Sequence, residues 1–88
     1  MRVTVRLFGS PALSIRTQTI QLELPPDATA GLMLQRLEEA LATPPLAEKL
    51  AGQYVVMVDG TAVEHLSGWE TPLVEGSVVS IVPVAMGG

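Results

Sequence analysis

Two segments in the first half of the chain alternate between apolar and polar residues. Over residues 2–8, Val3, Val5 and Leu7 fall on one side and polar residues on the other, which is the two-residue period of a half-buried strand. Residues 17–24 repeat this alternation, and Pro25-Pro26 ends it because proline cannot donate a hydrogen bond to a β-ladder. The pattern predicts two strands that form a hairpin with a long connection.

A helix is predicted after these prolines, where the apolar spacing changes to three and four residues. Leu34, Leu37 and Leu41 mark the stripe of an amphipathic helix. Thr29 is suited to be its N-cap, and Pro44-Pro45 should end it near Ala42 because proline breaks the helical hydrogen-bond pattern. One further short turn is expected over residues 46–50.

The second half of the chain is again predicted to form mainly β-strands. Residues 53–58 are rich in β-branched side chains, and Asp59-Gly60 favours a tight hairpin turn into a short strand over residues 61–63. A loop is expected over residues 64–76 and a last strand over residues 77–83.

This order of elements, β-β-α-β-β-β, provides one helix to cover one face of a mixed sheet. We therefore expect an α+β domain with the β-grasp (ubiquitin-like) fold over residues 1–83. Its mixed sheet should have four to five strands, with the first and last side by side in the middle, under one main helix. Residues 84–88 should form a flexible tail that ends in Gly-Gly.

Composition and charge narrow the function. The 88 residues are 48% apolar and 16% charged, so some apolar surface should remain for a protein partner. A net charge of −4 argues against nucleic acid or an anionic membrane as a partner. Without cysteine and with one histidine, no metal site is expected and a thiol nucleophile is excluded. Arg2 and Arg6 interrupt the start of the chain and no apolar run reaches membrane-spanning length, so we expect a cytoplasmic protein.

From Met57 onward the residues resemble the ubiquitin-like sulfur carriers of the MoaD/ThiS type, and most of all the small subunits of molybdopterin synthase. The stretches that carry the resemblance are Val58-Asp59-Gly60, the segment TPLVEGSVVSIVP at residues 71–83, and the terminal Gly87-Gly88. Residues 5–9 and 27–32 also resemble the family's first strand and helix entry.

The chain departs from the usual family pattern at three positions. Ser77 stands where an acidic residue is usual, Val84 where a second proline is common, and Met86 where a small residue is usual. Carriers that serve cysteine, thiamine-thiazole or thiolated-tRNA synthesis therefore stay open as alternatives. So do a ubiquitin-like protein modifier and a simple adaptor domain.

The resemblance implies that sulfur is carried on the last residue. An E1-like adenylating enzyme (MoeB type) would consume ATP to adenylate the carboxylate of Gly88, which would then become a thiocarboxylate. Gly87 and Gly88 lack a Cβ atom and so fit a narrow channel, and residues 83–88 extended span about 20 Å. The chain would bind no cofactor and would be no enzyme on its own. Its implied client is the large catalytic subunit of molybdopterin synthase (MoaE type), in molybdenum cofactor biosynthesis.

The residues expected to contact partners lie on the last strand, on the tail and at the end of the first strand. Val78, Val82 and Val84 alternate with the inward Val79 and Ile81, so they should form an apolar outer face. The other candidates are Phe8, Pro83, Ala85 and Met86. Phe8 lies opposite Val3, Val5 and Leu7, and either faces outward or packs under a loop.

The remaining large apolar side chains are expected to have structural roles. Leu66 and Trp69 should anchor the long loop rather than contact a partner. Met33 and Met57 are expected to fill the core.

Overall fold

The computed structural model describes residues 1–9, 16–41 and 54–83. Its elements follow one another as β1 (Arg2–Leu7), β2 (Gln18–Glu23), α1 (Ala30–Leu41), β3 (Tyr54–Val58), β4 (Thr61–Ala62), the 3-10 helices η2 (Val63–His65) and η3 (Gly68–Glu70), and β5 (Val78–Pro83). These bounds agree with the predicted strands and helix to within one residue at each end. The short turn predicted over residues 46–50 lies outside the described residues.

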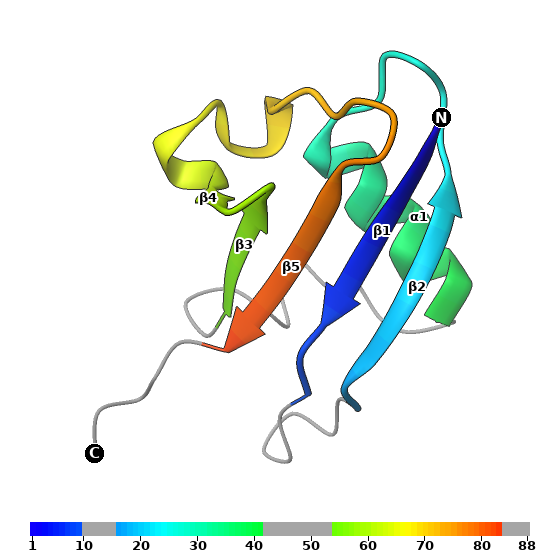
Figure 1. The fold of residues 1–88 in the computed structure, drawn as a ribbon, viewed down its shortest axis with the longest axis vertical. Helices are drawn as coiled ribbons and strands as arrows, with labels where there is room; N and C mark the ends of the chain where they lie inside the picture. Colours follow the sequence, from blue (N-terminus) through cyan, green and yellow to red (C-terminus); the bar gives the residue numbers. More distant parts are fainter. Residues whose placement is uncertain (10–15, 42–53, 84–88) are drawn as a thin grey trace.

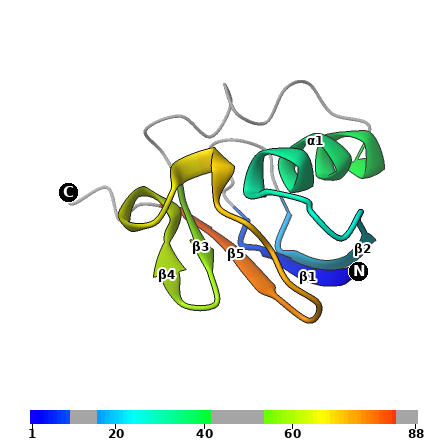
Figure 2. The ribbon, with the colours of Figure 1, turned by 90° about the horizontal axis from the view of Figure 1, so that it is seen from above.

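The strands form one five-stranded sheet in the order β2-β1-β5-β3-β4 (Figure 1). β1 and β5 run parallel in its middle, and the other neighbouring pairs are antiparallel. α1 lies across one face of the sheet (Figure 2). The sequence-based prediction of a β-grasp fold, with its first and last strands adjacent, is confirmed.

The core lies between the sheet and α1, as the alternation predicts. Val3, Val5 and Leu7 of β1 and Val79 and Ile81 of β5 are buried there, and β3 adds alternate residues. From α1 come Met33, Leu34 and Leu37.

Thr29 caps α1 as predicted. Its hydroxyl accepts a hydrogen bond from the backbone amide of Leu32 over 3.3 Å, and its carbonyl accepts one from Met33 over 3.0 Å. The capping side chain satisfies an amide that has no partner within the first helical turn. The start of α1 is therefore well defined.

The predicted loop over residues 64–76 is more ordered than expected. It contains most of η2 and all of η3, and Pro72 forms a β-bridge with Thr29. The amide of Ala30 donates to the carbonyl of Thr71 over 2.9 Å, and the amide of Leu73 donates to that of Ala28 over 3.0 Å. These bonds hold the segment against the beginning of α1, which periodicity alone cannot reveal. None of the described helices is long and apolar enough to cross a membrane.

Candidate functional site

The strand that leads to the C-terminus is held from both sides. β5 pairs with β1 from Val78 to Ile81 and with β3 from Val79 to Pro83, and the amide of Phe8 donates to the carbonyl of Ile81 over 2.9 Å. The last described residue, Pro83, therefore ends a strand that has a neighbour on each side. The predicted sulfur-carrying residues Gly87 and Gly88 lie outside the described residues, as do Val84, Ala85 and Met86.

The start of β5 is fixed by the turn that follows β3. The side chain of Asp59 accepts a hydrogen bond from the amide of Val78 over 2.8 Å, and the amide of Asp59 donates to the carbonyl of Val78 over 2.9 Å. Asp59 has φ 48° and Gly60 has φ 90°, the left-handed values that a tight type I′ hairpin turn needs. The predicted turn thus also sets the register of β5.

The turn just before β5 has its own side-chain anchor. Ser77 is buried, and its hydroxyl accepts a hydrogen bond from the amide of Val74 over 3.0 Å. The amide of Ser77 returns a bond to the carbonyl of Val74, also over 3.0 Å. The hydroxyl therefore closes this turn at the position where the resemblance predicts an acidic residue.

The face of the sheet opposite α1, which we call the outer face, is apolar where β3 and β5 meet. Val78 is 38% exposed and Val82 is half-buried, as the alternation predicts. Val55 lies opposite Val82 and Met57 opposite Ser80 in the antiparallel register, so both point the same way as their partners. Phe8, Val55, Met57, Val78 and Val82 together form what we call the apolar patch.

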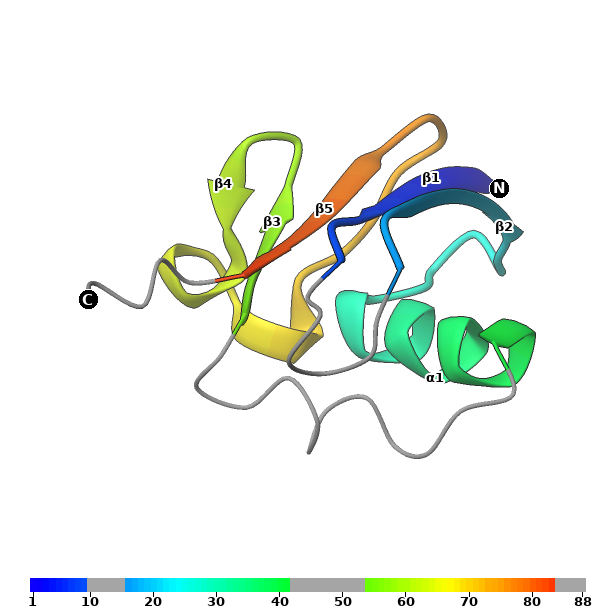
Figure 3. The ribbon, with the colours of Figure 1, turned by 90° about the horizontal axis from the view of Figure 1, so that it is seen from below.

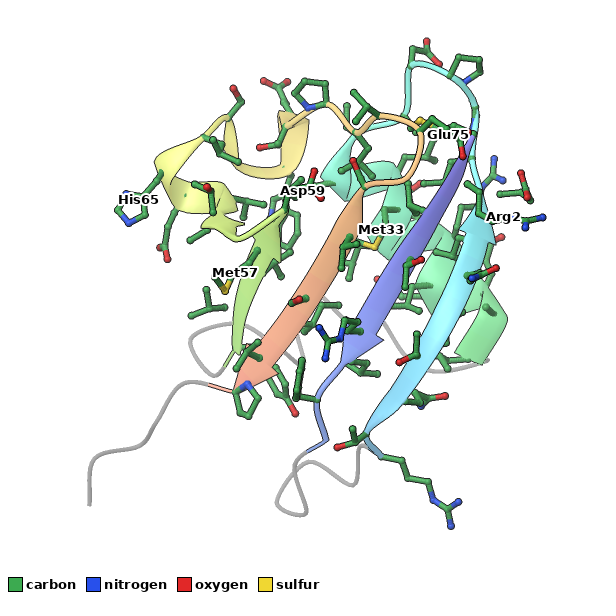
Figure 4. All side chains as sticks on the ribbon, in the orientation of Figure 1. Arg2, Met33, Met57, Asp59, His65 and Glu75 are labelled. Carbon is green, nitrogen blue, oxygen red and sulfur yellow. The ribbon has the colours of Figure 1, made fainter. Side chains whose placement is uncertain are left out.

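Met57 is not core filler, and that expectation is wrong. It is half-buried, and alternation along β3 directs it away from the buried Val56 and Val58. Met33, in contrast, is fully buried as predicted. Figure 4 labels the two methionines, Met57 on β3 and Met33 with the core behind the sheet. Val55 and Met57 are absent from the predicted partner-binding set because strand register, which places them beside β5, cannot be read from either strand alone.

Phe8 belongs to the outer face. It is half-buried, and the guanidinium carbon of Arg6, an outward residue of β1, lies 5.5 Å from the centre of its ring, within the range of a cation–π contact. The ring of Phe8 therefore lies on the outer face, as the first of its two predicted alternatives has it, while the loop residues 10–15 lie outside the described residues.

The half of the outer face formed by β1 and β2 is charged. Arg2 and Glu23 form an exposed ion pair at 2.7 Å, and Arg6 is exposed between them and the apolar patch. Exposed pairs of this kind add little to stability. The outer face therefore has an apolar half on β3 and β5 and a polar half on β1 and β2.

Pro83 lies at the edge of this surface rather than within it. It is exposed and lies opposite Tyr54, whose side chain is buried on the α1 side. Alternation therefore directs Pro83 to the other side of the sheet from Val82. Its predicted contact with a partner stays a prediction.

The side chains of Leu66 and Trp69 are not buried beneath the segment of residues 64–76. Their side chains are 46% and 45% exposed, so the expectation that they anchor it by burial is wrong. Backbone bonds to α1 hold the segment instead, which leaves both side chains free for contact with another molecule. Over the described ranges, no three His, Cys, Asp or Glu side chains are grouped so that they could hold a metal ion.

Comparison with known proteins agrees with this architecture. A model of the ThiS family matches residues 5–88, while no curated protein matches the sequence. The structure is similar to that of SAMP1, a small archaeal modifier protein from Haloferax volcanii, with a TM-score of 0.73, 22% identity and all of both chains covered.

Two further solved structures belong to molybdopterin-converting factors. A putative subunit 1 from Pyrococcus furiosus has a TM-score of 0.62 and 19% identity over 93% of this chain and 95% of its own. A chain from the complex of subunits 1 and 2 from Helicobacter pylori has a TM-score of 0.53 and 24% identity, with both chains fully covered. At these identities the likeness establishes the fold.

Proposed function

The chain belongs to the ThiS family, whose model extends to its last residue, Gly88, and we propose that it carries sulfur as a thiocarboxylate on Gly88. The carboxylate would attack the α-phosphate of ATP in an activating enzyme and release pyrophosphate. Hydrosulfide would then attack the acyl carbon of the adenylate and displace AMP, which leaves the thiocarboxylate. Activation converts a poor electrophile into a good one, as in other covalent routes, so no side chain of the chain itself needs to react.

The observation that carries the proposal is the match to a carrier family together with the position of β5. Because β5 is bonded on both sides, a partner that holds the domain also positions the start of the segment after Pro83. Residues 84–88, extended in a partner's channel, would reach about 17 Å beyond Pro83. Gly87 and Gly88 would let the backbone pass where a Cβ atom would not fit.

Docking would use the apolar patch. It lies beside the end of β5, so a partner that covers it is already next to the reactive end of the chain. Removing this partly exposed surface of valine, methionine and phenylalanine from water favours binding, and aromatic residues and methionine are enriched in interface cores. Both the activating enzyme and the sulfur-accepting enzyme would need to bind the domain near β5.

Among clients, we favour the large catalytic subunit of molybdopterin synthase. The segment at residues 71–83 resembles the small subunits of that enzyme, and the Helicobacter pylori relative is described as part of a complex of subunits 1 and 2. The chain would then be the sulfur-donating subunit of a transferase complex. A carrier for another pathway would have the same reactive end.

A protein modifier is the second candidate, because SAMP1 has the highest TM-score of the three structures compared and covers the whole chain. In that role the activated carboxylate of Gly88 would join a lysine amine rather than take sulfur. The β-grasp fold is common to both roles and does not choose between them.

The test is the intact mass of protein with an unmodified C-terminus after incubation with ATP, a sulfur donor and an activating enzyme. A gain equal to the difference between a sulfur and an oxygen atom supports the carrier, whereas lysine-linked adducts support the modifier. No change in mass would refute both. A variant that lacks Gly88 should remain folded and unchanged in mass.

A matched pair of variants separates docking from chemistry. Val82→Asp places a charge in the apolar patch, and Thr19→Asp places the same charge on the polar half of the outer face. The first should slow thiocarboxylate formation and the second should not. Adding the large subunit of molybdopterin synthase with its pyranopterin precursor then tests the client, because the stored sulfur should be lost only if that enzyme accepts it.

A further inference from the structure

A second surface lies on the other side of the molecule, between α1 and η3. It is a groove of about 350 Å³ lined by Gly31, Leu34, Gln35, Glu38 and Trp69. Leu34 forms an apolar floor and is 4% exposed, while the indole of Trp69 forms a wall and is 45% exposed. The proposed sulfur-carrying role does not use this groove.

The groove is preformed by backbone packing. A Cβ atom on Gly31 would lie 3.2 Å from the carbonyl oxygen of Trp69 and 3.5 Å from its Cβ atom, so glycine lets η3 approach α1 closely. The bonds from Ala30 to Thr71 and from Leu73 to Ala28 tie the same segment to the start of the helix. Because the backbone is tied on both sides, a ligand would meet a wall that is already in position.

The charge around the groove is acidic. Glu38 lines the groove, and Glu70 follows Trp69 directly in η3. An acidic rim attracts a basic partner.

An indole wall, an apolar floor and an acidic rim together suit an arginine side chain. Its guanidinium stacks on aromatic faces and pairs with carboxylates, and its alkyl stem covers apolar surface. The groove is near the lower end of small-molecule pocket volumes, so it suits one or two long side chains of a peptide segment rather than a large cofactor.

We propose that this groove is a docking site for a basic segment of a partner protein, with an arginine side chain along Trp69. Figures 2 and 3 show η3 beside α1 in the layer that covers one face of the sheet, away from the outer face. A partner in the groove therefore leaves the apolar patch free. Two partners bind the domain at the same time, one by the groove and one by the outer face.

The test uses the full chain and a defined probe, the peptide acetyl-Gly-Arg-Leu-Arg-Gly-amide. Trp69 is the only tryptophan, so its fluorescence reports on the groove directly, and amide chemical shifts map the contact. We expect shifts confined to α1 and η3 and none with the same peptide in which glutamate replaces arginine. Shifts spread over the surface, shifts on the outer face, equal binding of the acidic peptide, or no binding at millimolar concentration would each overturn the proposal.

Three variants sharpen the result. Trp69→Leu should weaken binding of the peptide about tenfold. Because this variant lacks the fluorophore, its binding is measured from amide chemical shifts. Glu70→Lys, an exposed change that should leave the fold intact, should weaken it about as much and reduce the dependence on salt. Leu66→Ala removes an equally exposed apolar side chain that does not line the groove, and should bind as the parent does. Unchanged binding by the first two, or a loss with Leu66→Ala equal to theirs, refutes the assignment.

Discussion

Two neighbours on β5 should separate the stability of the domain from its recognition by partners. Ile81 is fully buried between the sheet and α1, whereas Val82 is half-buried on the outer face. Ile81→Ala removes side-chain volume from the centre of the core, where surrounding residues cannot collapse to fill the space. We expect it to lower the free energy of unfolding by about 3 kcal/mol.

Val82→Ala should cost about 1 kcal/mol or less, because the site is already partly hydrated and the loss is mainly of cross-strand contact. Urea unfolding measures both values. With a slope of about 1 kcal/mol per molar urea, typical of a small domain, Ile81→Ala should lower the midpoint by about 3 M. Val82→Ala should lower it by about 1 M at most.

The rate of thiocarboxylate formation should show the opposite ranking, with the larger loss for Val82→Ala. At a temperature where both variants are folded, Val82→Ala should slow thiocarboxylate formation by the activating enzyme about fivefold or more. Ile81→Ala should leave the rate close to that of the parent. Equal losses of stability, or a larger loss of rate with Ile81→Ala, would show that the assignment of these two residues to opposite faces is wrong.

Three further outcomes follow from the turns and the core. Asp59→Ala should lower the free energy of unfolding by about 1 kcal/mol, because it removes the bond to the amide of Val78 and a residue that tolerates positive φ; Asp59→Asn should lose less, and equal urea midpoints for the two would contradict this. Gly60→Ala should cost at least about 1 kcal/mol in the same assay, since its φ is 90°, and an unchanged midpoint would refute the turn. Tyr54→Phe should raise the free energy of unfolding by about 1 kcal/mol, because the Tyr54 hydroxyl is the one buried side-chain oxygen or nitrogen of the described residues without a hydrogen-bond partner; a fall in thermal midpoint would show that this hydroxyl has a partner in solution.

The strands, the helix and the hairpin turn could be predicted from the sequence because each depends on local geometry. Alternation identifies which residues of a strand share a face, and the prolines and Asp59-Gly60 mark where elements stop. The β-grasp order and the resemblance together placed the first and last strands side by side. Alternation also predicted that Val78 and Val82 of β5 lie on the outer face.

Other parts of the candidate site depend on contacts between distant residues. Val55 and Met57 join the apolar patch only because β3 pairs with β5 in one particular register. A shift by one residue would exchange their faces. Met57 looks like core material in a run of β-branched residues, and nothing within that run indicates which alternate set faces α1.

The sequence by itself determined the type and approximate limits of each described element, the cap at Thr29, and the family to which the chain belongs. Tertiary structure decided the strand register that assembles the apolar patch. It also decided how residues 64–76 are held against the start of α1, and the exposure of Trp69 beside Gly31. The physical reason is the range of the interactions: periodicity, capping and turn formation act over a few residues, whereas register and burial depend on packing between segments far apart in the chain.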